Sequence, residues 1–285
     1  MPRGINIYDE ARLQGRLWTP ALVRPALWLD AADLSTISVA TGVSEWRDKS
    51  GNGRHFTQGT GGTQPTFTAN GLNSIPVLSF NGSQYLTSPA AVSTWNFLHN
   101  TNGSSIFVVW KAGNIADPNA AYGLMGTNAA TSANIGTYIA FDDRASVPRN
   151  NGVLAQVSGG GSTSVSAASA DNLMPANTPV ILSHIADPNN GTAANRSFVR
   201  VNKTLSQINT QLTAPSASNA SFALQIGALG NNVLTLTGYI AEIVVLASVA
   251  STAIRQQIEG HLAWKWGLRA NIVDDHPFKN QPPLI

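Results

Sequence analysis

The acidic residues that could perform hydrolysis do not form a catalytic pair. A retaining glycosidase places two carboxyl groups about 5 Å apart, on either side of the scissile bond. The chain has four glutamates, Glu10, Glu45, Glu242 and Glu259. No E-x-D-x-x-E pattern joins any of them, and we interpret Glu242, alone in an Ala-Glu-Ile segment, as a carboxylate at the rim of a strand. Asp142–Asp143 and Asp274–Asp275 are adjacent pairs, so their side chains would face opposite sides of a strand.

Motifs for nucleophilic catalysis, metal binding and phosphate binding are also missing. No G-x-S-x-G elbow is present. The triple glycine at 159–161 is not followed by Lys-Ser or Lys-Thr, so it does not predict a phosphate loop. The histidines are dispersed, and none has a second histidine at metal-ligand spacing: His55, His99, His184, His261 and His276. We therefore predict that the protein is not an enzyme.

One segment carries the mixture of side chains that sugar-binding sites use. Such sites place an aromatic face beside carboxylate or amide groups, which orient the ligand. The segment supplies this mixture in Tyr138, Phe141, Asp142, Asp143 and Arg144. The same residues also fit an ordinary strand end followed by a charged turn. The sequence leaves both interpretations open.

The composition is typical of a turn-rich β protein with a surface of amides and hydroxyls. Charged residues make up 11% of the 285 residues, against about 25% in ordinary soluble proteins. The net charge is +2 and the basic residues are scattered, so we do not expect a nucleic acid as a partner. Cysteine is absent, which excludes disulfides and thiolate metal sites.

Targeting and membrane segments are not apparent in the chain. Residues Met1–Glu10 lack the apolar region of a signal peptide. No run of 18 apolar residues occurs, so we expect no membrane insertion. We expect synthesis in a cytoplasm without a signal peptide, and release by another route such as lysis.

Strand patterns begin at residue 26 and continue along most of the chain. Leu27–Asp30 reads as a strand, and Val43–Asp48 alternates with period two before a tight turn at Lys49–Gly53. Ser105–Lys111 is too apolar for a half-exposed strand, and we expect it in the interior.

One helix is predicted near the end of the chain. Ser251 can cap a helix running from about Thr252 to Trp266, and Gly267 can end it. Four apolar residues recur at every fourth position and predict one face that packs on the strands: Ile254, Ile258, Leu262 and Trp266. His261 lies beside that face, where we interpret it as a histidine at the edge of a packed surface.

Residues 26–285 are predicted to form one domain. The low-complexity stretch Ser158–Ala170 resembles a linker, but strands of the same character continue on both sides. We expect a long surface loop or a flat polar strand there.

Residues 1–25 differ from the rest and are predicted to form an N-terminal arm. Pro20 and Pro25 prevent a long helix, and the arm is too short for its own core. Either it packs back on its own domain or it docks on a neighbouring subunit, because aromatic and arginine residues are enriched at interfaces. The anchoring residues in the second case are Tyr8, Arg12, Arg16, Leu17 and Trp18.

Several motifs together resemble the LamG-like, concanavalin A-type jelly rolls. At the start these are L-W-L-D-A-A-D-L-S-T-I (27–37), W-R-D-K-S-G-N-G-R (46–54) and the segment 64–86. At the end they are I-G-A-L-G (226–230), G-Y-I-A-E-I-V-V (238–245) and I-E-G-H-L-A-W-K-W-G-L…H-P-F (258–278). The resemblance covers most of residues 26–280 and is weakest between 112 and 176. Residues 1–25 join directly to the L-W-L-D strand, and this arrangement resembles the versions of the jelly-roll module that are found in bacteriophage particles.

This resemblance implies an all-β fold, a two-sheet antiparallel jelly-roll sandwich with one short C-terminal helix. The family often binds calcium through loop oxygens, which implies a calcium site as an alternative to a protein without cofactors. Its candidate ligands would be Asp30, Asp33, Asp48 and Asn52. We favour another role for Asp48 and Asn52, in which their side chains hold the turn through bonds to the backbone.

The expected function is that of a non-enzymatic virion surface protein of a bacteriophage, as a capsid decoration or a fibre component. The arm would attach it to other capsid or tail proteins, in a homo-oligomer on the particle surface. The alternative is a carbohydrate-binding module that recognises host glycans. A fold does not determine a function, so both remain hypotheses at this stage.

Overall fold

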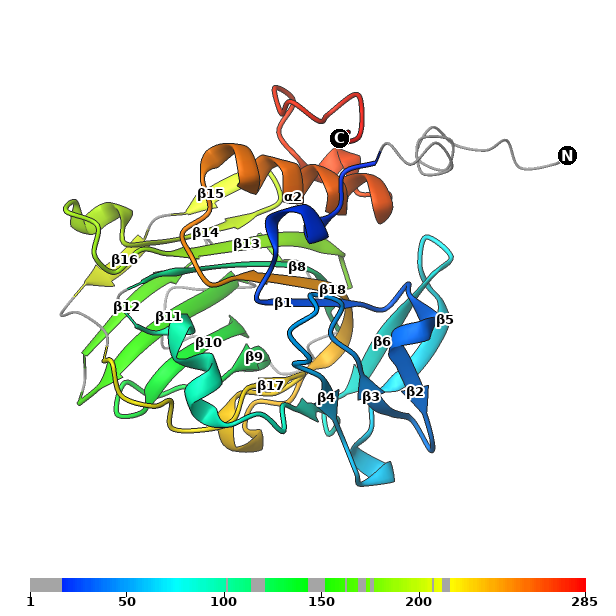
Figure 1. Ribbon diagram of the computed structural model, residues 1–285, viewed down its shortest axis with the longest axis horizontal. Coiled ribbons are helices and arrows are strands. Elements are labelled where there is room, and N and C mark those ends of the chain that lie inside the picture. Colours follow the sequence, from blue (N-terminus) through cyan, green and yellow to red (C-terminus); the bar gives the residue numbers. More distant parts are fainter. Residues whose placement is uncertain are drawn as a thin grey trace, which may run out of the picture.

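The computed structural model describes residues 17–100, 102–113, 121–142, 152–161, 163–168, 173–174, 177–206, 208–211 and 216–285. These residues form two antiparallel β-sheets that pack face to face, with one α-helix on the outer side (Figure 1). The predicted all-β sandwich with a C-terminal helix is confirmed. No helix in the described part is long and apolar enough to cross a membrane.

Within the described residues, eight strands form the sheet nearer the helix. Seven of them follow one another in space: β15 (Thr204–Ser206), β14 (Ser197–Val201), β13 (Val180–Ala186), β8 (Ser104–Ala112), β18 (Thr237–Leu246), β6 (Ile75–Asn81) and β5 (Thr66–Leu72). The eighth, β1 (Leu27–Asp30), pairs with the second half of β18, beyond the end of β6. The first and last strands of the domain are therefore neighbours.

The second sheet has ten strands in the described part of the chain. Their spatial order is β16 (Ile208–Gln211), β12 (Thr163–Ala168), β11 (Gly152–Gly160), β10 (Ile135–Asp142), β9 (Ala121–Gly126), β17 (Gln225–Ile226), β7 (Leu86–Thr87), β4 (Phe56–Thr57), β3 (Val43–Trp46) and β2 (Ile37–Val39). The low-complexity stretch contributes to β11 and β12, so the flat polar strand is the correct alternative there.

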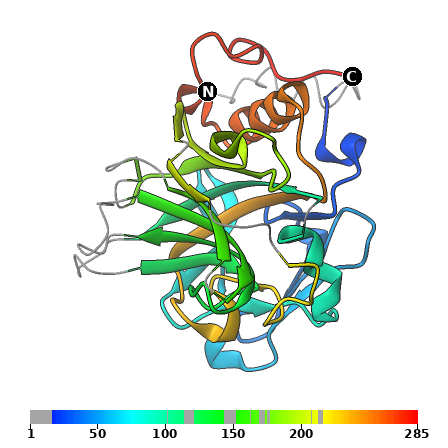
Figure 2. The same cartoon turned by 90° about the vertical axis from the view of Figure 1, so that its left-hand side faces the viewer.

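Helix α2 (Thr252–Lys265) begins and ends close to the predicted positions, with the Ser251 side chain accepting a hydrogen bond from the backbone of Ile254. It lies on the outer face of the eight-stranded sheet, away from the second sheet (Figure 1 and Figure 2). The short 3-10 helices are η1 (Pro20–Val23), η2 (Leu34–Thr36), η3 (Gly61–Thr63), η4 (Val92–Leu98), η5 (Ala193–Asn195), η6 (Gly230–Asn232) and η7 (Arg269–Asn271).

The central strand β8 shows how the three layers are held together. Ile106, Val108 and Trp110 point into the core between the two sheets. Phe107 and Val109 point the other way, into the core beneath α2. Both faces are buried, which explains why this strand reads as a continuous apolar run. Each such fully buried side chain contributes about 1.5–3 kcal/mol.

The last part of the predicted arm packs on the domain itself. Leu17 forms an isolated bridge with Leu284, and the backbone of Trp18 donates to the carbonyl of Pro283 over 3.0 Å. The Trp18 side chain is buried in the core beneath α2. Its ring meets that of His261 edge-on, with 6.1 Å between the centroids. These two residues therefore follow the first alternative, in which the arm packs back on its own domain.

Candidate functional site

The site is built on β1, whose residues alternate between two cores. Leu27 and Leu29 face the core between the sheets, while Trp28 faces the layer beneath α2. Asp30 follows Trp28 with the period of two that a strand imposes, so it lies on the same outer face. The strand thus presents an indole and a carboxylate side by side to the helix.

A β-bulge in β18 brings a second carboxylate to this face. Between Ile240 and Glu242 the register of β18 against β8 shifts by one residue, at Ala241. Ile240 faces the core between the sheets, and strict alternation would send Glu242 there too. The extra residue turns the Glu242 side chain toward the helix instead. There Glu242 lies directly opposite Asp30 of the neighbouring strand β1.

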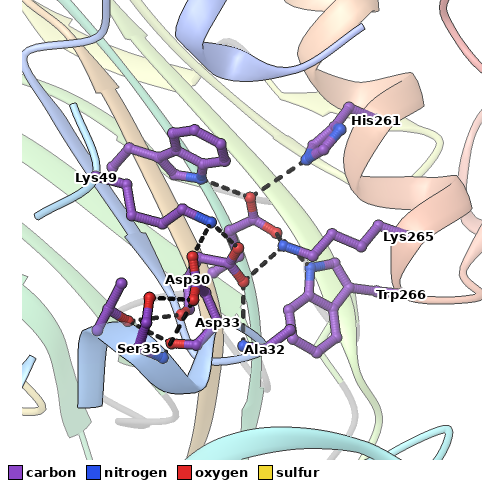
Figure 3. A network of polar contacts seen from close by, with 11 residues as sticks. Asp30, Ala32, Asp33, Ser35, Lys49, His261, Lys265 and Trp266 are labelled. Carbon is purple, nitrogen blue, oxygen red and sulfur yellow. Dashed lines mark hydrogen bonds and ion pairs between the residues drawn. The ribbon is translucent and has the colours of Figure 1, made fainter. Parts of the chain in front are cut away.

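Glu242 is fully buried and receives four donors. Its Oε1 accepts from the indole nitrogen of Trp28 at 2.8 Å and lies 3.3 Å from Nε2 of His261. Its Oε2 accepts from the indole nitrogen of Trp266 and from Nζ of Lys265, both at 2.7 Å (Figure 3). Burial alone would raise the pKa of Glu242, but Lys265 and His261 hold it below its ordinary value. Glu242 is thus a buried anchor, and its interpretation as a rim carboxylate is wrong.

Lys265 connects this anchor to Asp30. Its Nζ lies 2.6 Å from Oδ1 of Asp30 and 2.7 Å from Oε2 of Glu242. Lys265 stands four residues after His261 on α2, so both side chains project from one face of the helix. The helix therefore supplies both groups that neutralise the paired carboxylates.

Lys49 approaches Asp30 from the opposite side, on the turn after β3. The backbone of Lys49 donates to the carbonyl of Trp28, and the backbone of Trp28 donates to the Asp48 carboxylate. These bonds hold Nζ of Lys49 4.4 Å from the centroid of the Trp28 ring and 2.8 Å from Oδ2 of Asp30. Burial alone would lower the pKa of Lys49, but the carboxylates of Asp30 and Asp33 raise it.

Asp33 completes the arrangement at the outer edge. It caps η2, because its Oδ1 accepts from both the backbone and the hydroxyl of Ser35. Its Oδ2 lies 2.8 Å from Nζ of Lys49. The hydrogen bonds from Lys49 and Ser35 lower the pKa of Asp33 to about 2. Asp33 is the most accessible carboxylate of the group, with 33% of its side chain exposed.

Most of these groups line a cavity of about 520 Å³ between η2, β1 and α2, and Glu242 is not among the lining residues. Its polar side chains include Asp30, Asp33, Lys49 and Lys265, and Leu34 adds an apolar side chain that is 60% exposed. The volume falls within the range of about 300–1,000 Å³ that is usual for small-molecule sites. The cavity can therefore hold a ligand in contact with donors and acceptors that are already fixed in place.

The calcium ligands proposed from the sequence are not brought together as a cation site. Asp30 and Asp33 both face Lys49, which occupies the position that a shared cation would need. Asp48 accepts from the backbone of Ser50, and Asn52 donates to the carbonyls of Pro25 and Ala26. The turn-holding role of Asp48 and Asn52 is confirmed. In the described part of the chain, no three acidic, histidine or cysteine side chains group as metal ligands.

The described part of the segment proposed to bind glycans lies elsewhere, in β10. Tyr138, Phe141 and Asp142 are at most 4% exposed, so their side chains belong to the interior. Asp143 and Arg144 lie outside the described residues, as do Tyr8, Arg12 and Arg16 of the arm. Tyr138, Phe141 and Asp142 do not line the cavity beside α2, whereas Leu17 of the arm does.

Sequence reasoning missed the two lysines of the cavity. The sequence patterns predict a turn at Lys49 and the last turn of a helix at Lys265, and they indicate no role for either side chain. The only local signal is the four-residue spacing of His261 and Lys265. Their meeting with Asp30 depends on strand pairings between distant segments, which spacing does not reveal.

A second buried glutamate lies on the other side of α2. Glu259 accepts from the Ser183 hydroxyl at 2.9 Å and from Nη1 of Arg255 at 2.7 Å, and it lies 3.5 Å from Nε2 of His276. Burial would raise its pKa, but these three partners lower it. A smaller cavity of about 300 Å³ borders this group. The contact with His276 joins the H-P-F tail to the helix.

The sequence matches no protein-family model and no curated protein. Among solved structures, the receptor-binding domain of the botulinum neurotoxin C/D mosaic serotype is similar over 84% of this chain and 52% of that one, with 10% identity and a TM-score of 0.53. The binding domain of botulinum neurotoxin DC, in complex with SialylT, is similar over 82% and 50%, with 9% identity and a TM-score of 0.50.

At these identities the likeness shows a shared β-sandwich fold of the jelly-roll type. The chain matches about half the length of the toxin domains. The CBM40 domain of the Ruminococcus gnavus IT-sialidase, bound to α2,3 sialyllactose, is similar over 62% of this chain and 92% of that one, with 11% identity. Its TM-score of 0.44 is too low to support a further argument.

Proposed function

We propose that this domain is a non-enzymatic glycan-binding module whose site is the cavity beside α2. The observation that carries the proposal is the set of fixed polar groups around that cavity. Lys49 is held between Asp30 and Asp33, and Lys265 between Asp30 and the buried Glu242. Because the protein's own ion pairs hold these side chains in place, little ordering is needed on binding.

The chemistry of the lining suits sugar hydroxyls. Each ammonium group has three N–H donors, and each of the two lysines uses two of them on carboxylates. One N–H donor remains on each lysine, next to carboxylate oxygens that can accept a further hydrogen bond. A hydroxyl both donates and accepts, so it can bridge such a pair. The exposed side chain of Leu34 offers an apolar surface to the C–H groups of a sugar ring.

The same contacts support binding without hydrolysis. Glu242 is fully buried beneath four donors, so it has no contact with a ligand in the cavity. Asp33 stays ionised because its pKa is about 2, so it is a poor general acid. The toxin domain of the same fold that was solved with SialylT agrees with a binding role, but the argument rests on the cavity.

The virion-surface role stays a prediction beside this proposal. Its anchoring residues Tyr8, Arg12 and Arg16 lie outside the described residues, and Trp18 is buried in the domain's own core. A glycan-binding domain on a particle surface would satisfy both expectations. Co-sedimentation of the full chain with phage particles, compared with a chain lacking residues 1–16, tests that role separately.

A glycan microarray probed with the full chain tests the proposed function. We expect binding that is lost in Ala32→Trp, because Ala32 lines the cavity and a bulky ring there would fill it. Ala193→Trp is the matched control, since Ala193 is exposed on η5 and does not line the cavity. Bound oligosaccharides should remain uncleaved on long incubation. Binding that survives Ala32→Trp in a folded variant, or a blank array, would overturn the proposal.

A further inference from the structure

We infer that the cavity beside α2 selects uncharged sugars and rejects sugars that carry a carboxylate. This inference rests on the proposed function and narrows it to a ligand class. It follows from the charges around the cavity and from the ion pairs that the two lysines already make with carboxylates.

With the buried Glu242 beneath the cavity included, the net charge of the site is not positive in either state of its histidine. Three carboxylates, from Asp30, Asp33 and Glu242, face two ammonium groups, from Lys49 and Lys265 (Figure 3). With His261 neutral the balance is three negative charges against two positive, a net charge of −1. With His261 protonated the net charge is zero. A site that binds an acidic sugar by charge pairing needs a net positive charge or an unpaired cation.

Neither lysine is available as an unpaired cation. Lys49 makes two contacts of 2.8 Å with carboxylates, and Lys265 makes contacts of 2.6 and 2.7 Å. A ligand carboxylate could pair with either lysine only by displacing Asp30 or Asp33, or by lying against them. If a ligand carboxylate took the place of Asp30 beside Lys265, the Asp30 carboxylate would remain opposite Glu242 with no cation between the two. Like charges so close together are destabilising.

The rim of the cavity adds to this discrimination. Asp33 is the most exposed carboxylate there, and it stays ionised because its pKa is about 2. A ligand carboxylate at this edge of the cavity would therefore lie close to a negative charge. An amine on the ligand would in turn compete with Lys49 for the same two aspartates, so uncharged hydroxyls fit the site better than either ion.

A microarray of matched oligosaccharides tests the inference with the full chain. Each neutral glycan is printed beside counterparts that differ by one sialic or uronic acid and by one free amine. We expect the acidic and amino counterparts to bind at least about tenfold more weakly, which is about 1.4 kcal/mol. Equal or tighter binding of either charged counterpart would overturn the inference and leave the proposed function standing. A blank array would overturn both.

A charge reversal at the rim provides a second test. Asp33→Lys changes the net charge of the site from −1 to +1, and we expect it to bring acidic glycans to at least the affinity of their neutral counterparts. Asp274→Lys is the matched control, because Asp274 is also an exposed aspartate paired with lysines but does not line the cavity. An unchanged preference in Asp33→Lys, or the same change in both variants, would contradict the role of the local charge.

Discussion

Asp30 of β1 and Glu242 of β18 are paired directly across two antiparallel strands, with the ammonium group of Lys265 between their carboxylates. Two like charges in such a position are unfavourable on their own. Here they attract Lys265 from the helix and, through Asp30, Lys49 from a turn. The pair thus brings together polar groups at the cavity and beneath it from four separate segments of the chain: β1, β18, α2 and the turn after β3.

Glu242→Gln should destabilise the domain by about 3–5 kcal/mol, because it leaves Lys265 close to a neutral buried group. Urea denaturation measures this change. The double variant Glu242→Gln with Lys265→Met should recover part of the loss. Asp274→Asn is the control, since Asp274 is 83% exposed, and should leave the stability nearly unchanged. A loss below about 1 kcal/mol in Glu242→Gln would show that the anchor is unimportant.

Trp18→Ala should cost about 3–5 kcal/mol, because the indole is 4% exposed and packs against α2 near His261. Thermal or urea unfolding of the isolated protein is sufficient to measure it. Had Trp18 been an anchor for a neighbouring subunit only, its removal would leave the stability of the isolated domain unchanged. That result would contradict the packing described above.

Gly238→Ala should be among the most damaging small substitutions. Gly238 has a φ of +144°, and an added Cβ would lie 1.9 Å from the carbonyl oxygen of Lys111. Overpacking and backbone strain of about 1–3 kcal/mol each predict a loss of about 2–6 kcal/mol. Gly59→Ala is the matched control, because a Cβ there meets nothing within 4 Å. Equal stability of the two variants would argue against the close approach at Gly238.

Stability should fall as the pH is lowered from about 7 to about 5, in part because of His184. Burial lowers the pKa of His184 from 6.5 to about 4, so the unfolded chain binds a proton that the folded chain excludes. A group with a lowered pKa of this kind stabilises the fold above its unfolded pKa, and this contribution is lost as the pH falls toward the folded pKa. The loss over this range is about 2 kcal/mol. Urea titrations at the two pH values measure it.

His184→Gln should reduce that pH dependence, whatever its effect at neutral pH. A smaller remaining slope is expected from His99, because burial lowers its pKa as well. A slope unchanged by His184→Gln would contradict the assignment to His184.

Asp33→Asn should weaken binding of a neutral glycan at least about tenfold. It removes the charge from the most accessible carboxylate of the cavity, and a hydrogen bond to a charged group is worth about 1.5–3 kcal/mol. Asp274→Asn should leave the affinity unchanged, because it does not line the cavity. Isothermal titration calorimetry compares the two variants, and equal affinities would place the site elsewhere.

Much of the fold could be predicted because its signals are local. Leu27–Asp30 and Val43–Trp46 form strands as their patterns indicate, and α2 follows the cap at Ser251. The face of the helix that packs on the sheet is buried, as the four-residue spacing predicts, through Ile258, Leu262 and Trp266. Such patterns depend on neighbours along the chain, which the sequence shows directly.

The site could not be predicted because its contacts are not local. Trp28 and Glu242 are separated by 214 positions, and their contact depends on the pairing of β1 with β18. The side of the strand that Glu242 faces is set by one extra residue at Ala241. A strict alternation of inward and outward residues gives the wrong side from that point on.

The bridge between Leu17 and Leu284 has a consequence for the connectivity of the domain. The two ends of the described chain meet, so the path of the backbone is nearly a closed ring. A covalent link between those ends, with a new opening at the exposed residues Gly59 and Thr60, would keep every strand pairing intact. We therefore expect the arrangement of the layers to survive this change in the order of the segments.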